Sequence, residues 1–314
     1  MEQSPIAARL RSIFRGELKV DEPLSKHTSF RIGGPADFLA IPADREELNS
    51  LLQFAVNAAV PFFILGRGTN ILAPDQGFRG LVIKIADRLD KTRFEGQHLV
   101  VEGGASLSRA AWMAVERGLA GLEFAVGIPG TVGGGLVMNA GAFGGDLGRL
   151  AVEVTVMDLR GGIRVLPREE LSFGYRTSSL AGGKAVVVEA VLRLQEADAA
   201  MLASRARENL ERRRLTQPLG LPSAGSVFKN PPGDFAGRLI EAAGCKGLCR
   251  GDACVSELHA NYIVNRGSAT ARDVLALMEE IQEKVGKAFG VYLEPEIQVL
   301  GVYGSGSGGR WKQS

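Results

Sequence analysis

GIPGTVGGGLVMNAGAFGGD, residues 127–146, is the stretch that decides what this chain can build. It holds eight glycines and one charged residue, Asp146, so a ligand bound there would meet main-chain groups rather than charged side chains. A solvated linker is the competing interpretation, but six positions are strongly apolar: Ile128, Val132, Leu136, Val137, Met138 and Phe143. The stretch therefore predicts a folded, glycine-rich cradle for a ligand.

A second glycine-rich loop, LGRGTNIL at residues 65–72, follows a predicted strand. Backbone amides near glycines at such a position can bind phosphate oxygens. The dinucleotide-binding fingerprint would need glycine where Ile71 stands and a helix after the loop, so we expect no Rossmann site. Alone, the loop also fits an ordinary tight turn. Together, the two loops predict a site for a long ligand with a pyrophosphate in its middle.

The segment before this loop predicts a strand, a helix and a strand, at residues 37–41, 44–59 and 60–65. Asp44 is the expected N-cap, and Glu47 places a carboxylate in the first turn. One helix face is apolar: Leu48, Leu51, Leu52 and Ala55. This is the pattern of a βαβ unit.

Beyond the unit, short strand-like runs and one helix near residues 107–117 predict a second α+β lobe. The runs are residues 81–85, 98–105, 152–159, 162–167 and 185–194. A helix at about residues 197–215 leads to a third region, which ends in an amphipathic helix and a strand. That last helix should begin at Thr270, with Asp273 three residues on, and end at Gly290.

The bulk properties limit the choice of function. A chain of 314 residues exceeds the usual size of one core, so we expect two or three domains. The net charge is only +2, and we interpret the basic run at residues 212–214 as a solvated face or a local anion contact. We find no signal-like or membrane-length apolar run. We therefore expect a cytoplasmic protein that binds neither nucleic acid nor membranes.

The three cysteines do not predict a metal site. Cys245, Cys249 and Cys254 form C-x3-C-x4-C, which lacks a fourth ligand and the usual C-x2-C pair. The three histidines are scattered along the chain, at residues 27, 98 and 259. We expect reduced thiols and no bound metal.

Six motifs in a fixed order resemble the bacterial UDP-N-acetylenolpyruvoylglucosamine reductases. They are HTSFRIGGPAD, LGRGTNIL, GIPGTVGGGLVMNAGAFG, SFGYRTSSL, SAGSVFKNP and LEPEI, spread over residues 24–301. The resemblance implies an α+β protein with a two-subdomain FAD-binding region of the vanillyl-alcohol-oxidase type, followed by a C-terminal α+β substrate-binding domain. We place the FAD-binding region at residues 1–203, with subdomains at about 1–83 and 84–203. The substrate domain follows at residues 204–302, and residues 303–314 form a flexible tail.

The resemblance also implies the chemistry and the flavin contacts. The family uses NADPH to reduce FAD and then reduces the enolpyruvyl ether to UDP-N-acetylmuramate, a step in peptidoglycan synthesis. Carried over by motif, the cofactor-binding residues are Gly66, Arg67, Gly68, Thr69, Asn70, Gly127, Ile128, Pro129, Gly130, Thr131, Val132, Gly133, Gly134, Asn139 and Ala140. Arg67 can either pair with phosphate or point to solvent.

Reducing such an ether requires a hydride donor, stabilisation of the developing negative charge, and an acid. Flavin is the hydride source. The resemblance assigns the catalytic roles to Arg176, which can grip a carboxylate, to its partner Glu296, and to the proton donor Ser226. Glu294 is the alternative carboxylate if the register differs, and Ser223 is a competing hydroxyl.

Three further residues are expected at the substrate. Lys229 and Asn230 suit the phosphates or the sugar, whereas Tyr175 either binds or packs. Only residues 181–184 separate the SFGYRTSSL motif from the strand-like run at residues 185–194, so this chain resembles the shorter family type without an inserted tyrosine loop. We expect a monomer. A flavin-dependent oxidase and a non-catalytic sensor of the same ligands remain the rival interpretations.

Overall fold

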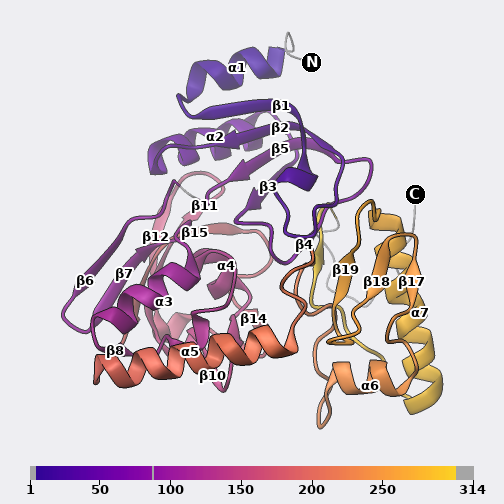
Figure 1. The fold of residues 1–314 in the computed structure, drawn as a ribbon. Coiled ribbons are helices and arrows are strands. Elements are labelled where there is room, and N and C mark those ends of the chain that lie inside the picture. Colours follow the sequence, from indigo (N-terminus) through magenta and orange to yellow (C-terminus); the bar gives the residue numbers. More distant parts are fainter. Residues whose placement is uncertain (1–4, 87, 302–314) are drawn as a thin grey trace.

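A four-stranded sheet forms the first of three lobes in the computed structural model, which describes residues 5–86 and 88–301 (Figure 1). The predicted tail, residues 303–314, lies outside the described residues. The sheet order is β1-β2-β5-β3. Its elements are α1 (Pro5–Ile13), β1 (Glu17–Pro23), β2 (Pro35–Ile41), α2 (Arg45–Asn57), β3 (Phe62–Leu65) and β5 (Phe78–Lys84).

The predicted strand-helix-strand unit is present as β2, α2 and β3. Its two strands are not neighbours, because β5 lies between them and pairs in parallel with both. Asp44 caps α2 by accepting a hydrogen bond from the Glu47 amide at 2.9 Å, as expected. All four apolar positions of the predicted helix face are buried: Leu48, Leu51, Leu52 and Ala55. Each buried leucine contributes about 1.5–3 kcal/mol to stability.

The second lobe is built on an antiparallel five-stranded sheet of order β12-β11-β15-β7-β6. The strands are β6 (Thr92–Glu95), β7 (His98–Glu102), β11 (Ala151–Asp158), β12 (Ile163–Pro167) and β15 (Ala185–Arg193). The helices are α3 (Leu107–Glu116), α4 (Val132–Val137) and α5 (Ala199–Thr216). The apolar faces of the sheet and of the three helices share one core. The glycine-rich stretch around α4 is therefore inside a folded lobe, as predicted.

The third lobe contains α6 (Ala236–Ala242), α7 (Ala271–Phe289) and a sheet of order β17-β18-β19. The strands are β17 (Cys249–Arg250), β18 (Ala253–Val255) and β19 (Ile263–Asn265). Thr270 and Asp273 form a capping box at the start of α7, and Gly290 ends it with φ 68°. The core of this lobe includes Phe30 and Leu72 from the first lobe, so the two lobes share buried surface.

The remaining elements are short. The short strands are β4 (Ile71–Leu72), β8 (Leu119–Ala120), β9 (Gly141–Ala142), β10 (Gly145–Asp146), β13 (Phe173–Gly174), β14 (Thr177–Ser178), β16 (Gln195–Glu196) and β20 (Gln298–Val299). The 3-10 helices are η1 (Leu24–Lys26), η2 (Glu123–Ala125), η3 (Leu147–Arg149) and η4 (Arg168–Glu170). The final strand, β20, pairs in parallel with β4 and so returns the end of the chain to the first lobe.

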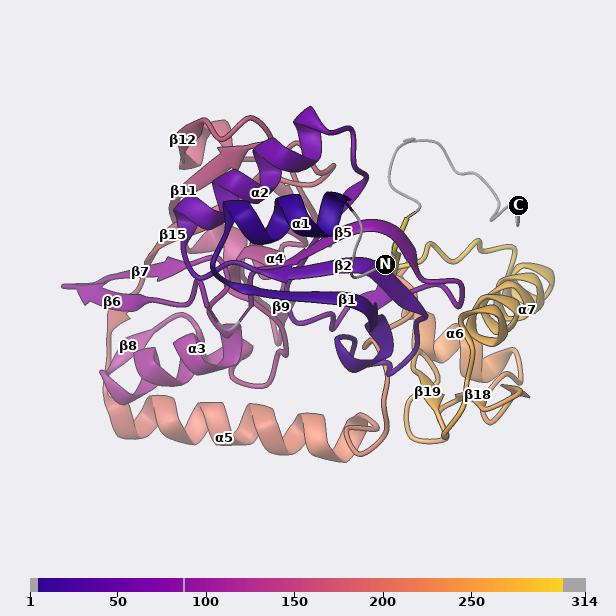
Figure 2. The same ribbon diagram turned by 90° about the horizontal axis from the view of Figure 1, so that it is seen from above.

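The helix α5 runs along the second lobe and leads into the third (Figures 1 and 2). Leu202 and Ala206 bury its inner face in the second core. The division into residues 1–83, 84–203 and 204–302 stays a proposal, in which α5 is the connection that spans the last boundary. No helix in the described part of the chain is long and apolar enough to cross a bilayer.

The cysteines differ from the expectation. Cys249 and Cys254 face each other across the β17–β18 hairpin and form a disulfide, so the prediction of reduced thiols was wrong for this pair. Strand pairing places the two cysteines opposite each other, which their spacing in the sequence did not reveal. Cys245 is buried and free, and burial raises the pKa of its thiol.

Candidate functional site

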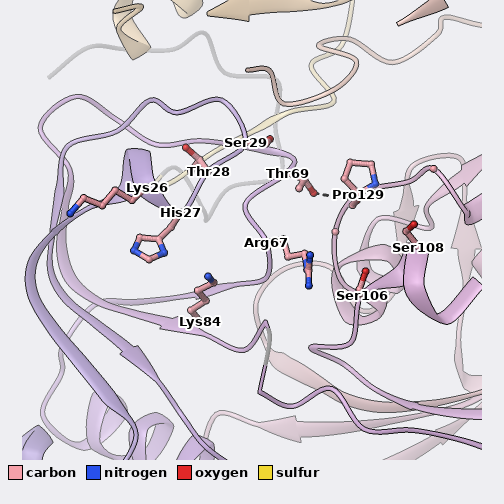
Figure 3. A pocket seen from close by; sticks show the side chains of 12 residues that line it. Lys26, His27, Thr28, Ser29, Arg67, Thr69, Lys84, Ser106, Ser108 and Pro129 are labelled. Atoms are coloured by element: carbon pink, nitrogen blue, oxygen red, sulfur yellow. Dashed lines mark hydrogen bonds between the residues drawn. The ribbon is translucent and has the colours of Figure 1, made fainter. Parts of the chain in front are cut away.

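The two glycine-rich loops lie against each other. Thr69 Oγ1 donates a hydrogen bond to the Pro129 carbonyl at 3.3 Å (Figure 3). A Cβ at Gly66 would lie 2.8 Å from Thr131 Oγ1, and one at Gly68, where φ is 62°, would lie 2.2 Å from the His27 carbonyl oxygen. Glycine at these positions therefore permits contacts that any side chain would block.

A cavity of about 560 Å³ opens between these loops, and several of its lining side chains are basic. Lys26, His27 and Lys84 reach it from the first lobe, together with Arg67 from the loop itself (Figure 3). The second lobe contributes Ser106, Ser108, Gly127, Pro129 and Gly130. Cations on the first-lobe side and serine hydroxyls on the second-lobe side of the cavity suit a pyrophosphate group.

One buried atom in this cavity requires a partner. His27 Nε2 lies 3.0 Å from Glu22 Oε1, whereas His27 Nδ1 has no hydrogen-bond partner among the described residues. Burial lowers the pKa of His27 despite the opposing bond to Glu22, so the ring is neutral at neutral pH. With Nε2 donating, Nδ1 is left as an acceptor. A ligand that carries hydroxyl groups beside its phosphates, as FAD does, fits this arrangement.

The amides of the first α4 turn are already used within the protein. Val132 and Gly133 donate to the carbonyls of Ala105 and Gly103, and Gly134 donates to Thr131 Oγ1. A Cβ at Gly133 would lie 2.9 Å from the Gly103 oxygen. Glycine at residue 133 therefore allows α4 to pack closely on the end of β7. Because the three amides already donate within the protein, the expectation that main-chain donors of the whole stretch bind the ligand does not extend to them.

Asn139 connects the cradle to the hairpin that carries Arg176. It has φ 44°, is buried, and donates from Nδ2 to the Gly174 carbonyl at 2.9 Å, while its Oδ1 accepts from the Gly148 amide at 2.9 Å. The neighbouring Ala140 donates its amide to the Gly135 carbonyl. Ile128 packs on the second core. These contacts give Asn139 a positioning role beside the predicted cofactor role.

Arg176 and Glu296 meet, although they lie 120 residues apart. Arg176 occupies the turn of the β13–β14 hairpin with φ 55°, and its Nε donates to Glu296 Oε1 at 2.6 Å. Its guanidinium also lies 5.2 Å from the centroid of the Tyr175 ring. Within the described residues, Nε is the only Arg176 nitrogen that donates a hydrogen bond, which leaves its two terminal nitrogens for a ligand.

Glu296 is held from both sides of the site. Its amide donates to the Val227 carbonyl at 2.7 Å, and its carbonyl accepts from Asn70 Nδ2 at 3.1 Å. Burial raises the pKa of Glu296, against the opposing charges of Arg176 and Lys229. Glu294, the alternative carboxylate, is 67% exposed at its side chain and pairs with Lys229 instead. The arrangement favours Glu296 over Glu294 as the partner of Arg176.

Ser226 lies opposite Tyr262, to which an antiparallel β-bridge joins it, and directly precedes Val227, whose carbonyl accepts from the Glu296 amide. The charges of Glu296 and Arg176 both act on the Tyr262 phenol, whose pKa is raised by burial. The competing hydroxyl residue, Ser223, contributes its carbonyl to a 2.6 Å bond from Ser29 Oγ. Ser226 is thus the serine adjacent in sequence to the residue that holds the Glu296 backbone.

The predicted substrate residues lie at the outer edge of the cluster. Lys229 Nζ lies 2.5 Å from Glu294 Oε1. Asn230 accepts from the Ala236 amide through Oδ1 at 3.0 Å and donates its own amide to the Tyr175 hydroxyl at 3.3 Å. Tyr175 therefore contacts the third lobe while its ring stays exposed.

Sequence reasoning missed Arg213 and Tyr262, and also seven residues that line the cavity: Lys26, His27, Thr28, Ser29, Lys84, Ser106 and Ser108. His27 begins one of the six motifs, which was a usable signal. Arg213 was treated as part of a basic run, but Arg212 and Arg214 are exposed whereas Arg213 is half-buried against Gly127. Nothing in the sequence around Tyr262 distinguished it from a core residue.

Comparisons with known proteins agree with this geometry. The family model described as an FAD binding domain matches residues 36–166, and the one described as the C-terminal domain of UDP-N-acetylenolpyruvoylglucosamine reductase matches residues 217–300. These matches confirm the predicted fold class, an α+β protein with an FAD-binding region of the vanillyl-alcohol-oxidase type and a C-terminal substrate-binding domain.

Whole-chain similarity is high. UDP-N-acetylenolpyruvoylglucosamine reductase 2 of Symbiobacterium thermophilum is 53% identical, over 95% of this chain and 97% of that protein. The reductase of Moorella thermoacetica is 46% identical, over 96% and 99%. The crystal structure of the Thermus caldophilus reductase aligns with a TM-score of 0.78 at 38% identity, covering 91% of this chain and 98% of that one. The chain therefore belongs to the UDP-N-acetylenolpyruvoylglucosamine reductase family.

Proposed function

We infer that the chain is an NADPH-dependent flavoenzyme that reduces UDP-N-acetylglucosamine enolpyruvate to UDP-N-acetylmuramate for peptidoglycan synthesis. The carrying observation is the 2.6 Å pair between Arg176 and Glu296, whose Glu296 amide bonds to the carbonyl of Val227, the residue after Ser226. Membership of the reductase family supports the substrate and the electron donor.

The cradle residues would hold FAD across the contact between the first two lobes. Arg67, Lys26 and Lys84 offer positive charge for the pyrophosphate, and His27 Nδ1 offers an acceptor for a hydroxyl. Bound FAD supplies a hydride, which it obtains from NADPH. Because residue 66 is glycine, its loop can approach Thr131 more closely than any side chain would allow.

Arg176 would bind the carboxylate of the enolpyruvyl group through its two terminal nitrogens. Its Nε is held by Glu296, so the guanidinium plane is fixed before substrate arrives. Negative charge that develops on the carboxylate during reduction is stabilised by a cation that stays charged at any working pH. Glu296 thus acts by orienting the cation, and its raised pKa reflects how little water reaches the pair.

Ser226 would donate the proton that completes the reduction. The proton leaves Ser226 Oγ for C2 of the substrate, which carries the developing negative charge. At the outer edge, Lys229, Asn230 and Tyr175 would bind the phosphates and the sugar; a diphosphate can replace the exposed Glu294 as the partner of Lys229.

All groups of the proposed reaction come from one chain, which supports a monomer. The net charge of +2 gives little attraction for nucleic acid. The soluble nucleotide substrates support activity in the cytoplasm rather than at a membrane.

An anaerobic cycle tests the proposal. The purified protein is reduced with NADPH while its visible spectrum is followed, and the UDP-enolpyruvyl sugar is then added. A yellow protein that bleaches with NADPH and recovers its colour with the sugar supports the reductase. Recovery with oxygen alone would indicate an oxidase, and ligand binding without bleaching would indicate a sensor. A protein that binds no FAD would refute the proposal.

A further inference from the structure

Asn70, the last residue of the loop that would hold FAD, is bonded to the segment that carries Glu296. Its Nδ2 donates to the Glu296 carbonyl at 3.1 Å, and its own carbonyl accepts from the Gln298 amide at 2.9 Å. Immediately after Asn70, β4 pairs in parallel with β20, with Ile71 opposite Gln298. The first lobe therefore holds the main chain at Glu296 itself and two residues beyond it.

The second lobe reaches the same segment through Met138. Gln298 Nε2 donates to Met138 Sδ at 3.0 Å. The next residue, Asn139, donates to the Gly174 carbonyl at 2.9 Å and so holds the β13–β14 hairpin, in which Arg176 occupies the turn. The glycine-rich cradle thus contacts both β20 and the Arg176 hairpin.

These contacts and the Arg176–Glu296 pair form a closed ring to which each lobe contributes. Each member is joined to the next by a hydrogen bond or by the chain itself. In order around the ring, the members are Asn70, Glu296, Arg176, Gly174, Asn139, Met138 and Gln298. A group in a closed ring can move only if a bond breaks or if the other members move with it. Arg176 is thereby held at a set position relative to the loop at residues 66–70.

The distance between this loop and Arg176 matters for the proposed reaction. Arg176 would hold the carboxylate of the enolpyruvyl group, whereas the hydride would come from FAD in the cradle. Transfer requires the hydride donor and the accepting carbon to lie about 3–3.5 Å apart, and a misplacement of about 1 Å can cost about 10²-fold in rate. The bond from Asn70 to Glu296 directly joins the two parts of the site whose separation must be set.

We propose that Asn70 and Gln298 are positioning residues of the second half-reaction, which set the place of the Arg176 guanidinium relative to bound FAD by holding Glu296. The inference rests on the proposed function of Arg176 and of the cradle. The resemblance assigned Asn70 to the cofactor, whereas in this role its side chain acts on the substrate carboxylate through the ring. Neither Asn70 nor Gln298 touches a reacting atom.

The test is Asn70→Ala in the full-length, FAD-loaded enzyme, which deletes the Nδ2 donor. Reoxidation by saturating UDP-enolpyruvyl sugar should be about 10- to 10²-fold slower, with reduction by NADPH nearly unchanged. The dissociation constant of FAD, measured by titrating flavin fluorescence with apoprotein, should be nearly unchanged. The dissociation constant of the sugar, measured from the spectrum of the oxidised enzyme, should also be nearly unchanged, because the Arg176–Glu296 pair still forms.

The matched control is Asn265→Ala. Asn265 Nδ2 also donates from one lobe to another, to the Phe30 carbonyl at 3.1 Å, but within the described residues no hydrogen bond joins Asn265 to the ring. This variant should lower the melting temperature at least as much as Asn70→Ala and leave the limiting rate of reoxidation unchanged. If it does not fold, Asn209→Ala replaces it, since that change removes a 3.0 Å bond to a backbone carbonyl within the second lobe.

Two further variants test the ring itself. Gln298→Ala cuts the link to Met138 and should slow reoxidation with the same selectivity, so it also carries the test if Asn70→Ala does not fold. Arg176→Lys should cost less in the Asn70→Ala background than in the native one, because the cation is already misplaced there. Additive losses, or weaker FAD binding in Asn70→Ala, would overturn the positioning role.

Failure of this role is distinguishable from failure of the proposed function. If the sugar reoxidises the native enzyme and Asn70→Ala equally fast, only the positioning role is wrong. If the sugar does not reoxidise the native enzyme, the proposed function is wrong. Equal slowing of both half-reactions in Asn70→Ala, or the same selective slowing in Asn265→Ala, would mean that the bond acts by packing the lobes together, which would also overturn the positioning role.

Discussion

Glu47 and Glu296 are both carboxylates withdrawn from water, and their surroundings differ in kind. Glu47 lies in the first turn of α2 and is 5% exposed. It accepts from the amides of Arg15 at 2.8 Å, Gly16 at 3.1 Å and Ala43 at 2.9 Å. Burial acts to raise its pKa, but these hydrogen bonds prevail and hold the pKa of Glu47 below the usual value.

Glu296 has fewer hydrogen-bond donors at its carboxylate than Glu47. Among the described residues its carboxylate receives one hydrogen bond, from Arg176, and burial outweighs that bond and the charges of Arg176 and Lys229 and raises its pKa. The difference teaches how the two regions are used. The Glu47 carboxylate accepts hydrogen bonds from three backbone amides of the first lobe. The Glu296 carboxylate bonds the Nε of Arg176 and leaves the two terminal nitrogens of that arginine for a ligand. We call Glu47 with the amides of Arg15, Gly16 and Ala43 the Glu47 anchor. We call Glu296 with Arg176 the Glu296 cluster.

The largest effect should come from Ser226→Ala, which tests whether the Glu296 cluster is where the reaction occurs. We expect the second half-reaction to slow about 10²- to 10⁴-fold, because the proton donor is lost, with flavin reduction by NADPH nearly unchanged. Stopped-flow absorbance in each half-reaction measures this. Ser223→Ala, three residues earlier, is the control and should match the native enzyme. Equal loss in both half-reactions would remove Ser226 from the acid role.

Arg176→Lys should have the next largest effect. Lysine keeps the charge but not the two-pronged geometry, so reoxidation by the sugar should slow about 10²-fold with little change in melting temperature. Arg45→Lys is the control for loss of an arginine fork, since Arg45 bridges Glu102 at 3.2 Å and Glu189 at 2.8 Å far from the cluster. Unchanged reoxidation in Arg176→Lys would mean that the arginine is misassigned.

Glu47→Gln sharpens the comparison from the side of stability. The amide can accept through one oxygen only, so buried backbone donors of the anchor lose their partner, at about 1–3 kcal/mol in the free energy of unfolding. Glu296→Gln should cost less, because it removes a charge that burial disfavours. Urea unfolding of both variants measures the difference. A larger loss for Glu296→Gln would contradict the distinction between anchor and cluster.

The pH dependence of stability gives the smallest effect, with opposite signs for the two residues. The stability that Glu47 contributes is present above its unfolded pKa of about 4.3 and is lost as the pH falls through its lower folded pKa. For Glu296 the folded pKa is raised, so its ionisation costs stability as the pH rises above about 4.3 through that value.

The free energy of unfolding, measured at about five pH values between pH 3 and pH 8, tests these signs. The native protein should be more stable than Glu47→Gln near neutral pH, and this difference in free energy of unfolding should shrink as the pH falls. The free energy of unfolding of the native protein relative to Glu296→Gln should instead increase as the pH falls. Two curves that slope the same way would refute the assignment of opposite pKa shifts.

Much of the fold could be predicted because its signals are local. The capping residues of α2 and α7, and the glycine that ends α7, act within one helical turn and were read correctly. The insertion of β5 between β2 and β3 could not be predicted, because strand order depends on which edges meet. The disulfide between Cys249 and Cys254 was missed for the same reason, since hairpin pairing decides it.

The site divides in the same way. The motifs named Arg176, Ser226 and Glu296, and composition alone indicated a glycine-rich cradle. Residue type and short spacing determine what a side chain or a turn is able to do, so the sequence by itself determined the inventory of groups, the helix ends and the family. Only the tertiary structure decided that Arg176 meets Glu296 rather than Glu294, that Asn139 holds the Arg176 hairpin, and that Tyr262 pairs with Ser226 in a β-bridge. These contacts join segments far apart in the chain, and their formation depends on how three lobes pack, which no local pattern encodes.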